Sequence, residues 1–136
     1  MSEQSHFETV RGYLEALEVT IDHEDAAEAL FRISDNARGI ANMVVDCEDD
    51  LLVIEQGILA IGRDDVAFYK KLLQINRELV HGAFVLDDAG QMLLFRDTLQ
   101  LANLDLNELE ASINALGLGL ATHAQLLLTY AAEQAA

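Results

Sequence analysis

The stretch DDVAFYKKLLQINRELVHGAFVLDDAGQ (residues 64–91) decides the fold, because its hydrophobic pattern changes midway from the helical period to the strand period. Residues 64–80 carry a stripe at helical spacing, which we expect to lie mainly in the core: Phe68, Leu72, Ile75 and Leu79. Gly82 is expected to end this helix, as glycine often does just after a helix. Residues 83–87 and 91–98 flank a turn signal at 88–90, and this arrangement predicts a β-hairpin.

The segments on either side add helices at both ends and more hairpin-linked strands. Residues 5–17 predict a first helix. Residues 105–134 predict a long last helix, in which Gly117 and Gly119 allow a kink or the close approach of another backbone. Between the first and middle helices we expect an acidic connector at 23–29 and short strands near residues 19–21, 30–33, 40–47 and 51–61. The order α-β-β-β(-β)-α-β-β-α predicts an α+β fold, with an antiparallel sheet packed by helices.

Composition restricts the class of protein. A chain of 136 residues with 51% hydrophobic and 24% charged residues is typical of one globular domain, which we expect to span residues 1–136. Acidic residues outnumber basic ones 24 to 8, so nucleic acids and anionic membranes are poor partners. Since neither a membrane-spanning apolar run nor a signal peptide is visible, we expect a cytoplasmic protein without membrane insertion.

The residues that usually carry chemistry form no known pattern. The single cysteine, Cys47, excludes an internal disulfide and a multi-cysteine zinc site, and its acidic neighbours argue against a thiolate nucleophile. The four histidines lack metal-ligand spacing. The acidic run at 46–50 lacks the glycine and glutamate of a calcium loop, so we interpret it as a hairpin turn. We therefore expect no catalytic, cofactor-binding or metal-binding residue and no enzyme activity.

Apolar residues beside the main helical stripes widen two of the predicted helix faces. They are Tyr69, Leu73 and Val80 in the middle helix and Leu126 and Leu128 in the last one. A wide apolar face indicates either a thick core or an association surface, and the sequence leaves both open. For the association surface we expect a partner or dimer interface at Tyr69, Leu73, Asn76 and Val80. Asn76 has two further interpretations, a hydrogen bond to backbone at a sheet edge or an ordinary surface position.

Three segments carry a resemblance to a known family. In residues 73–91 the matching positions are Asn76, Gly82, Phe84, Leu86, Asp87 and Gly90. Residues 94–101, followed by Leu104-Asp-Leu-Asn-Glu-Leu, and residues 44–49 match a strand-to-helix passage and a hairpin. Together they resemble the YbjN family, which is related to the CesT/Tir-type chaperones of type III secretion. The resemblance covers residues 8 to 130, and its motifs specify structure rather than catalysis.

The resemblance implies a twisted antiparallel sheet packed by helices, commonly in a homodimer. Secretion chaperones of this shape are small and acidic, and they bind extended effector segments through apolar patches. We therefore expect a non-enzymatic, homodimeric module that binds a partner polypeptide, with no cofactor. The alternative is a regulatory or sensory domain for a small ligand or a stress-response partner, which a sizeable pocket lined by His or Arg would favour. An enzyme would need histidines converging with carboxylates in a cleft.

Overall fold

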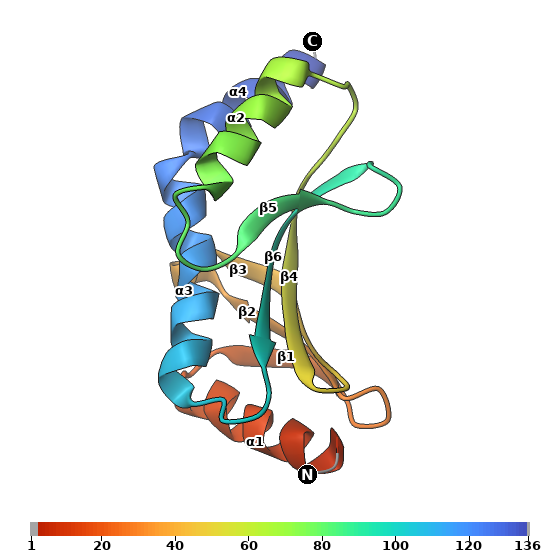
Figure 1. Ribbon diagram of the computed structural model, residues 1–136, viewed down its shortest axis with the longest axis vertical. Coiled ribbons are helices and arrows are strands. Elements are labelled where there is room, and N and C mark those ends of the chain that lie inside the picture. Colours follow the sequence, from red (N-terminus) through yellow and green to blue (C-terminus); the bar gives the residue numbers. More distant parts are fainter. Residues whose placement is uncertain (1–2, 136) are drawn as a thin grey trace.

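The computed structural model describes residues 3–135, and its centre is one six-stranded antiparallel sheet in the order β1-β2-β3-β4-β6-β5 (Figure 1). The strands are β1 (Thr20–Asp25), β2 (Leu30–Asp35), β3 (Ile40–Glu48), β4 (Leu51–Ala60), β5 (Ala83–Leu86) and β6 (Met92–Gln100). The helices are α1 (Glu3–Ala16), α2 (Val66–Asn76), α3 (Leu106–Thr122) and α4 (Ala124–Ala135), with a 3-10 turn at Asn36–Arg38. The predicted α+β class and the optional fourth strand before the middle helix are confirmed.

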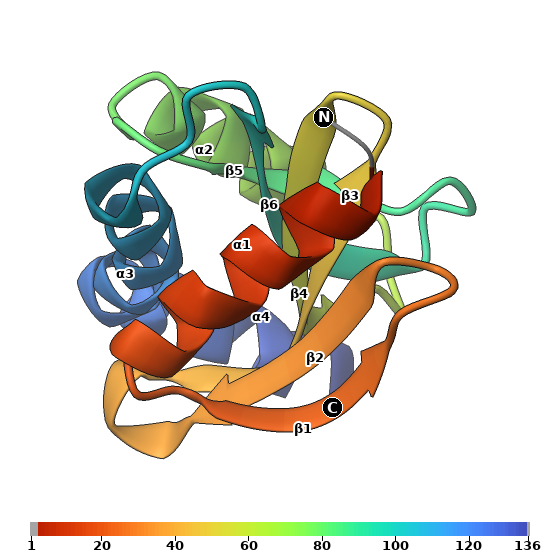
Figure 2. The same cartoon turned by 90° about the horizontal axis from the view of Figure 1, so that it is seen from below.

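The pairing of β4 with β6 makes β5 an edge strand and leaves α2 as the excursion between β4 and β5. The predicted hairpin is present, with Phe84 opposite Phe95. Its turn is held by Asp87 Oδ1, which accepts hydrogen bonds from the amides of Gln91 and Met92. Figure 1 shows α2, α3 and α4 stacked along one side of the sheet, and Figure 2 shows α1 crossing near β2.

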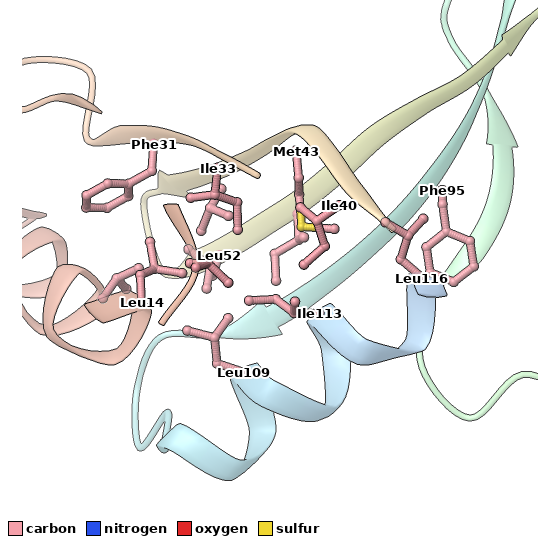
Figure 3. Packing of buried hydrophobic residues seen from close by; sticks show 14 of the residues in the cluster. Leu14, Phe31, Ile33, Ile40, Met43, Leu52, Phe95, Leu109, Ile113 and Leu116 are labelled. Carbon is pink, nitrogen blue, oxygen red and sulfur yellow. The ribbon is translucent and has the colours of Figure 1, made fainter. Parts of the chain in front are cut away.

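The core lies between these helices and one face of the sheet. Phe7 of α1 stacks on Phe31 of β2 with ring centroids 4.4 Å apart. The buried side of α3 is fully enclosed and faces the middle strands (Figure 3), through Leu109, Ile113 and Leu116. In α2, the predicted stripe is buried at Phe68, Leu72 and Ile75. These three residues form the buried part of the wide apolar face of α2, so this part of the face belongs to the core.

The boundaries of two predicted elements differ from the structure. The connector at 23–29 is half strand, because β1 continues to Asp25 before the turn. The middle helix ends at Asn76, so Leu79 is half-buried in the following loop and Gly82 is not the residue that ends the helix. Gly82 instead adopts a φ of +76°, and a Cβ there would overlap the Phe95 ring. Glycine is needed because a backbone turn passes directly over an aromatic ring.

The last predicted helix is divided in two. α3 and α4 meet at His123 with a bend of 65°, whereas Gly117 and Gly119 lie inside α3. Gly117 serves close approach, since a Cβ there would lie 2.5 Å from the Arg38 carbonyl oxygen. The bend places α4 over α2, where Tyr130 stacks on Phe68 at 4.0 Å and its hydroxyl donates to the Arg63 carbonyl. Tertiary contacts therefore decide the direction of α4.

Among residues 3–135, no single helix is long and apolar enough to cross a membrane. The bent pair α3 and α4 passes the same test of length and composition only when the two helices are taken together.

Candidate protein-binding surface

The outward side of α2 carries large apolar side chains that nothing in the described chain covers. Leu73 is 69% exposed, and Val80, in the loop after α2, is 91% exposed. Tyr69 is half-buried, and its hydroxyl donates to Asp64 Oδ1 at 2.8 Å. This hydrogen bond to a carboxylate raises the pKa of Tyr69 to about 12, so the phenol stays a neutral donor. The predicted interface thus contains two exposed aliphatic groups and one anchored aromatic group.

Asn76 has a different role from its neighbours, because its side chain is engaged within the chain. Its Nδ2 donates to the Phe84 carbonyl at 3.0 Å, and its Oδ1 accepts from the Phe84 amide at 2.8 Å. This confirms the interpretation of a hydrogen bond to backbone at a sheet edge. The carboxamide occupies the place that another strand would take beside β5, which blunts the edge against unwanted pairing. It also fastens the end of α2 to the sheet.

A groove of about 430 Å³ lies between α2 and β5, and we call it the α2–β5 groove. It is lined by Tyr69, Leu72, Leu73, Asn76, Phe84, Val85, Leu86 and Leu93. Three of the four predicted interface residues therefore come together, and Val80 does not join them. The lining is almost entirely apolar, and two of its members, Leu73 and Leu86, are exposed by 69% and 42%. Such a surface suits the burial of apolar groups from another molecule.

Val80 lines a second groove of about 450 Å³, which we call the α3 groove. One wall is the loop Glu78, Leu79, Val80 and His81, and the other wall comes from α3 and its end, with Ala111, Asn114, Ala115, Leu118, Gly119, Thr122 and His123. Leu118 is 70% exposed. The α3 wall is not among the residues expected from the sequence to form an interface. One feature of the sequence could have indicated this wall: Leu118 is a large apolar residue between Gly117 and Gly119, outside the apolar stripe of the helix.

Two histidines, His81 and His123, line the α3 groove, which meets the condition set for a ligand-binding domain. The groove is open at its rim, since Val80 and Leu118 are 91% and 70% exposed. Pockets for small ligands usually bury 70–90% of the ligand surface or more, so an open groove of this kind suits a polypeptide better.

The polar groups near His81 do not form a nucleophile. His81 Nδ1 lies 3.8 Å from Asp97 Oδ2, and the same carboxylate oxygen accepts from Ser112 Oγ at 2.7 Å. Ser112 is only 2% exposed, and its hydroxyl donates to the Asp97 carboxylate rather than to a histidine. Within residues 3–135, no group of three or more His, Cys, Asp or Glu side chains is arranged to hold a metal ion. The Asp97 carboxylate of β6 therefore lies between His81 of the loop 78–81 and Ser112 of α3.

The sheet face away from the core carries one electrostatic perturbation. Asp46 of β3 lies between the buried residues Val45 and Cys47, so its carboxylate points away from the core. Partial burial, a hydrogen bond with Glu48 and repulsion from Glu48, Glu28 and Glu55 raise the pKa of Asp46 to about 6. This carboxyl lines neither of the two grooves.

Comparison with solved structures shows the same fold in proteins of low sequence identity. YbjN from E. coli is 14% identical with a TM-score of 0.63, over 93% of this chain and 92% of that chain. The ExsC–ExsE complex matches at 14% identity and a TM-score of 0.65, over 89% and 92%. The HopA1–SchA chaperone–effector complex matches at 11% identity and a TM-score of 0.58, over 98% and 96%.

The comparison with curated proteins found no match. A family model, CesT_Tir_1, matches residues 3–133, nearly the whole chain. The YbjN and secretion-chaperone resemblance of the sequence is thereby confirmed. The chain belongs to the CesT_Tir_1 family.

Proposed function

We propose that this protein is a non-enzymatic, chaperone-like module that binds a partner polypeptide through exposed apolar surface and acts as a homodimer. The observation that carries the proposal is the α2–β5 groove, which holds Leu73 69% exposed beside a lining of large apolar side chains. Family membership supports it, and two solved relatives of the same fold are complexes, HopA1–SchA and ExsC–ExsE. The module is proposed to act in the cytoplasm as one domain over residues 1–136.

The outward side of α2 is the proposed dimer face. Leu73 lies two turns from Val66, which is 68% exposed, so both project from one side of the helix. A two-fold dimer would pair this surface with itself and bury both leucines, as isologous interfaces do. Tyr69 adds a rigid aromatic contact, while Asn76 positions the end of α2 rather than binding the second copy. The net charge of −16 keeps the assembly soluble and favours basic partners.

The dimer is tested by sedimentation velocity over a broad range of protein concentration. The variant Leu73→Asp is expected to be monomeric, because one carboxylate per subunit would be buried in the interface. Leu128→Asp is the matched control, since Leu128 is 66% exposed on α4 and lies outside both grooves. It is expected to remain dimeric. A wild-type protein that stays monomeric at every concentration would refute the dimer.

Partner binding is tested separately, with a photo-crosslinking amino acid in place of Leu73, Val80 or Leu128 in cells. Mass spectrometry then identifies the crosslinked partner and the segment that reacted. The proposal expects crosslinks to the second copy of the chain at Leu73, a reproducible partner segment at Val80, and neither at Leu128. Crosslinks that are equally frequent at all three positions would contradict binding at the grooves.

A regulatory domain for a small ligand is the second candidate, and the observation that favours it is the pair His81 and His123 in one groove of about 450 Å³. A ligand bound there would stabilise the folded state by an amount that grows with the logarithm of one plus its concentration divided by its dissociation constant, and would so raise the melting temperature. A thermal-shift screen of metabolites on the wild type and on His123→Ala tests this. A shift that disappears in His123→Ala would favour the regulatory role over polypeptide binding.

A further inference from the structure

The basic residues of the chain divide into paired and unpaired ones, and the unpaired ones gather on α2. The chain has 24 acidic and 8 basic residues, so carboxylates are in excess as partners for every Lys and Arg. Some of the basic residues form ion pairs with carboxylates of the chain: Arg11, Arg38, Arg63 and Arg96. Among the described residues, the basic ones that form no ion pair are Arg32, Lys70, Lys71 and Arg77. Three of these lie within residues 70–77, although the chain as a whole is strongly acidic.

Lys70, Lys71 and Arg77 form one exposed surface of α2, which we call the α2 basic ridge. Lys70 and Arg77 are seven residues apart, so they lie on the same side of the helix and about 10 Å apart along its axis. Arg77 keeps this spacing because its backbone is still helical, with a φ of −61° and a ψ of −28°. The opposite side of α2 is buried at Phe68 and Ile75, so the three cations are carried by a rigid element.

Lys71 stays unpaired although two carboxylates line the same groove. Asp65 and Glu133 lie with Lys71 in a groove of about 350 Å³ between α2 and α4, two helices that lie side by side (Figure 1). Both carboxylates bind Arg63 Nη2 instead, at 3.3 and 3.2 Å. Asp65 also accepts from a backbone amide as the N-cap of α2. Because these acids are already engaged, the charge of the ridge is left to be matched by another molecule.

Acidic residues border the α2 basic ridge at both ends and restrict the length of what it can bind. Asp64 lies before the N-cap of α2 and Glu78 follows Arg77, and both are exposed. A nucleic acid or an anionic membrane would extend beyond the ridge onto these carboxylates and onto the rest of a chain with a net charge of −16. A few separate carboxylates within about 10 Å fit the ridge, as in two turns of a helix or three extended residues.

We infer that the α2 basic ridge docks a short acidic segment of another protein, whose Asp or Glu side chains are spread over about 10 Å. No ridge residue lines the α2–β5 groove or the α3 groove, so this surface goes beyond the proposed function and its apolar contacts. Lys71 lines the groove toward α4, whereas Tyr69 and Leu73 line the groove toward β5, so the ridge borders the dimer face on the side of α4. Exposed ion pairs are individually weak, and the complex therefore weakens as salt is added.

The test is an NMR titration of the isotope-labelled wild type, because this measurement detects weak binding residue by residue. The probe is a synthetic peptide of Glu and Ala of about 10 residues, which spans the ridge as a helix of about 15 Å. The comparison peptide has Gln in place of Glu, and a thymidine oligonucleotide of the same length serves as the extended polyanion. Salt is kept at about 0.15 M, where a Debye length of about 8 Å screens the peptide from the distant acidic residues. We expect amide shifts concentrated at residues 66–78 with the Glu peptide and none with the other two probes.

Two variants decide whether the ridge carries the binding. Combining Lys70→Gln with Lys71→Gln is expected to weaken binding of the Glu peptide about fivefold, the effect of losing two exposed ion pairs. Arg32→Gln is the matched control, because Arg32 is also exposed and unpaired but lies on β2, and it is expected to bind within about twofold of the wild type. Circular dichroism checks that both variants keep their helices. Equal weakening in the two variants would overturn the inference, and so would a wild type that binds none of the probes or all of them equally.

These failures are distinguishable from failure of the proposed function. A wild type that dimerises and crosslinks to a partner at Val80, but does not bind the Glu peptide, overturns the inference alone. A monomeric wild type that binds the Glu peptide at residues 66–78 overturns the dimer and supports the inference.

Discussion

The two grooves are nearly equal in volume, about 430 and 450 Å³, but they are built differently. The α2–β5 groove is lined by large side chains from residues 69–93, and one polar clamp, Asn76 on Phe84, holds its walls together. The α3 groove joins a loop at 78–81 to a helix about 30 residues later, and three small residues of that helix, Ala111, Ala115 and Gly119, are among its lining residues. The first depends on a local hydrogen-bonded element, whereas the second depends on how α3 is positioned.

The largest effect is expected at Gly82, in the loop that separates the two grooves. Gly82→Ala would place a methyl group into the Phe95 ring at a φ of +76°, so both grooves would be distorted. We expect the free energy of unfolding to fall by about 3 kcal/mol, measured by urea denaturation. Gly90→Ala is the matched control, because φ is +70° and no atom lies within 4 Å of the added Cβ.

Gly90→Ala is expected to cost about 1 kcal/mol, the cost of the left-handed conformation alone. Equal losses in the two variants would mean that the ring relaxes without cost, and the loop would then not be held by packing.

The clamp at Asn76 gives the next largest effect. Asn76→Ala removes both hydrogen bonds to the Phe84 backbone, and we expect a loss of about 2 kcal/mol in the free energy of unfolding. Asn114→Ala is the corresponding change in the α3 groove, at an exposed helical position, and we expect a change within about 0.5 kcal/mol.

The comparison of the grooves predicts a further difference between these variants. Asn76→Ala should also weaken the dimer in sedimentation velocity, because the end of α2 is released from β5. If Asn114→Ala were as destabilising as Asn76→Ala, the polar clamp would not distinguish the two grooves.

The smallest effect is expected at Asp46, outside both grooves. Because the pKa of Asp46 is raised to about 6 in the folded protein, the folded state holds this proton more tightly than the unfolded chain. Its contribution to stability is therefore present below about pH 4 and is lost as the pH rises through about 6. Asp46→Asn removes this loss. Because solvent screens a carboxyl that is only partly buried, we expect the free energy of unfolding to rise by only about 1 kcal/mol at pH 7.5 and by almost nothing at pH 4.

Denaturation at both pH values checks the sign of this effect. Asp88→Asn, at an exposed carboxylate in the β5–β6 turn, is the control and should change the free energy of unfolding by less than about 0.5 kcal/mol. A gain that is larger at pH 4 than at pH 7.5 would contradict the assignment. Neither variant should change dimerisation.

Periodicity in the sequence was sufficient for most of the elements. The stripe Phe68, Leu72 and Ile75 was predicted to be core and is buried, and the hairpin about residues 88–90 is confirmed. The end of α2 was placed four residues too late, because Leu79 and Val80 continue a helical pattern that the Asn76–Phe84 hydrogen bonds interrupt. A competing side-chain contact of this kind has no signature in hydrophobic spacing.

The sequence by itself determined the class of the fold, the acidic surface and the wide apolar face of the middle helix, since these depend on composition and on residues a few positions apart. Only the tertiary structure decided that Val80 lines a groove with α3 instead of joining Leu73 in the α2–β5 groove. It also decided that α4 turns by 65° at His123 and that a second groove exists. Each of these depends on contacts between residues about 30 to 70 positions apart, such as Tyr130 with Phe68 and with the Arg63 carbonyl. Local propensity carries no information on such contacts, because they form only when distant elements pack on the same face of the sheet.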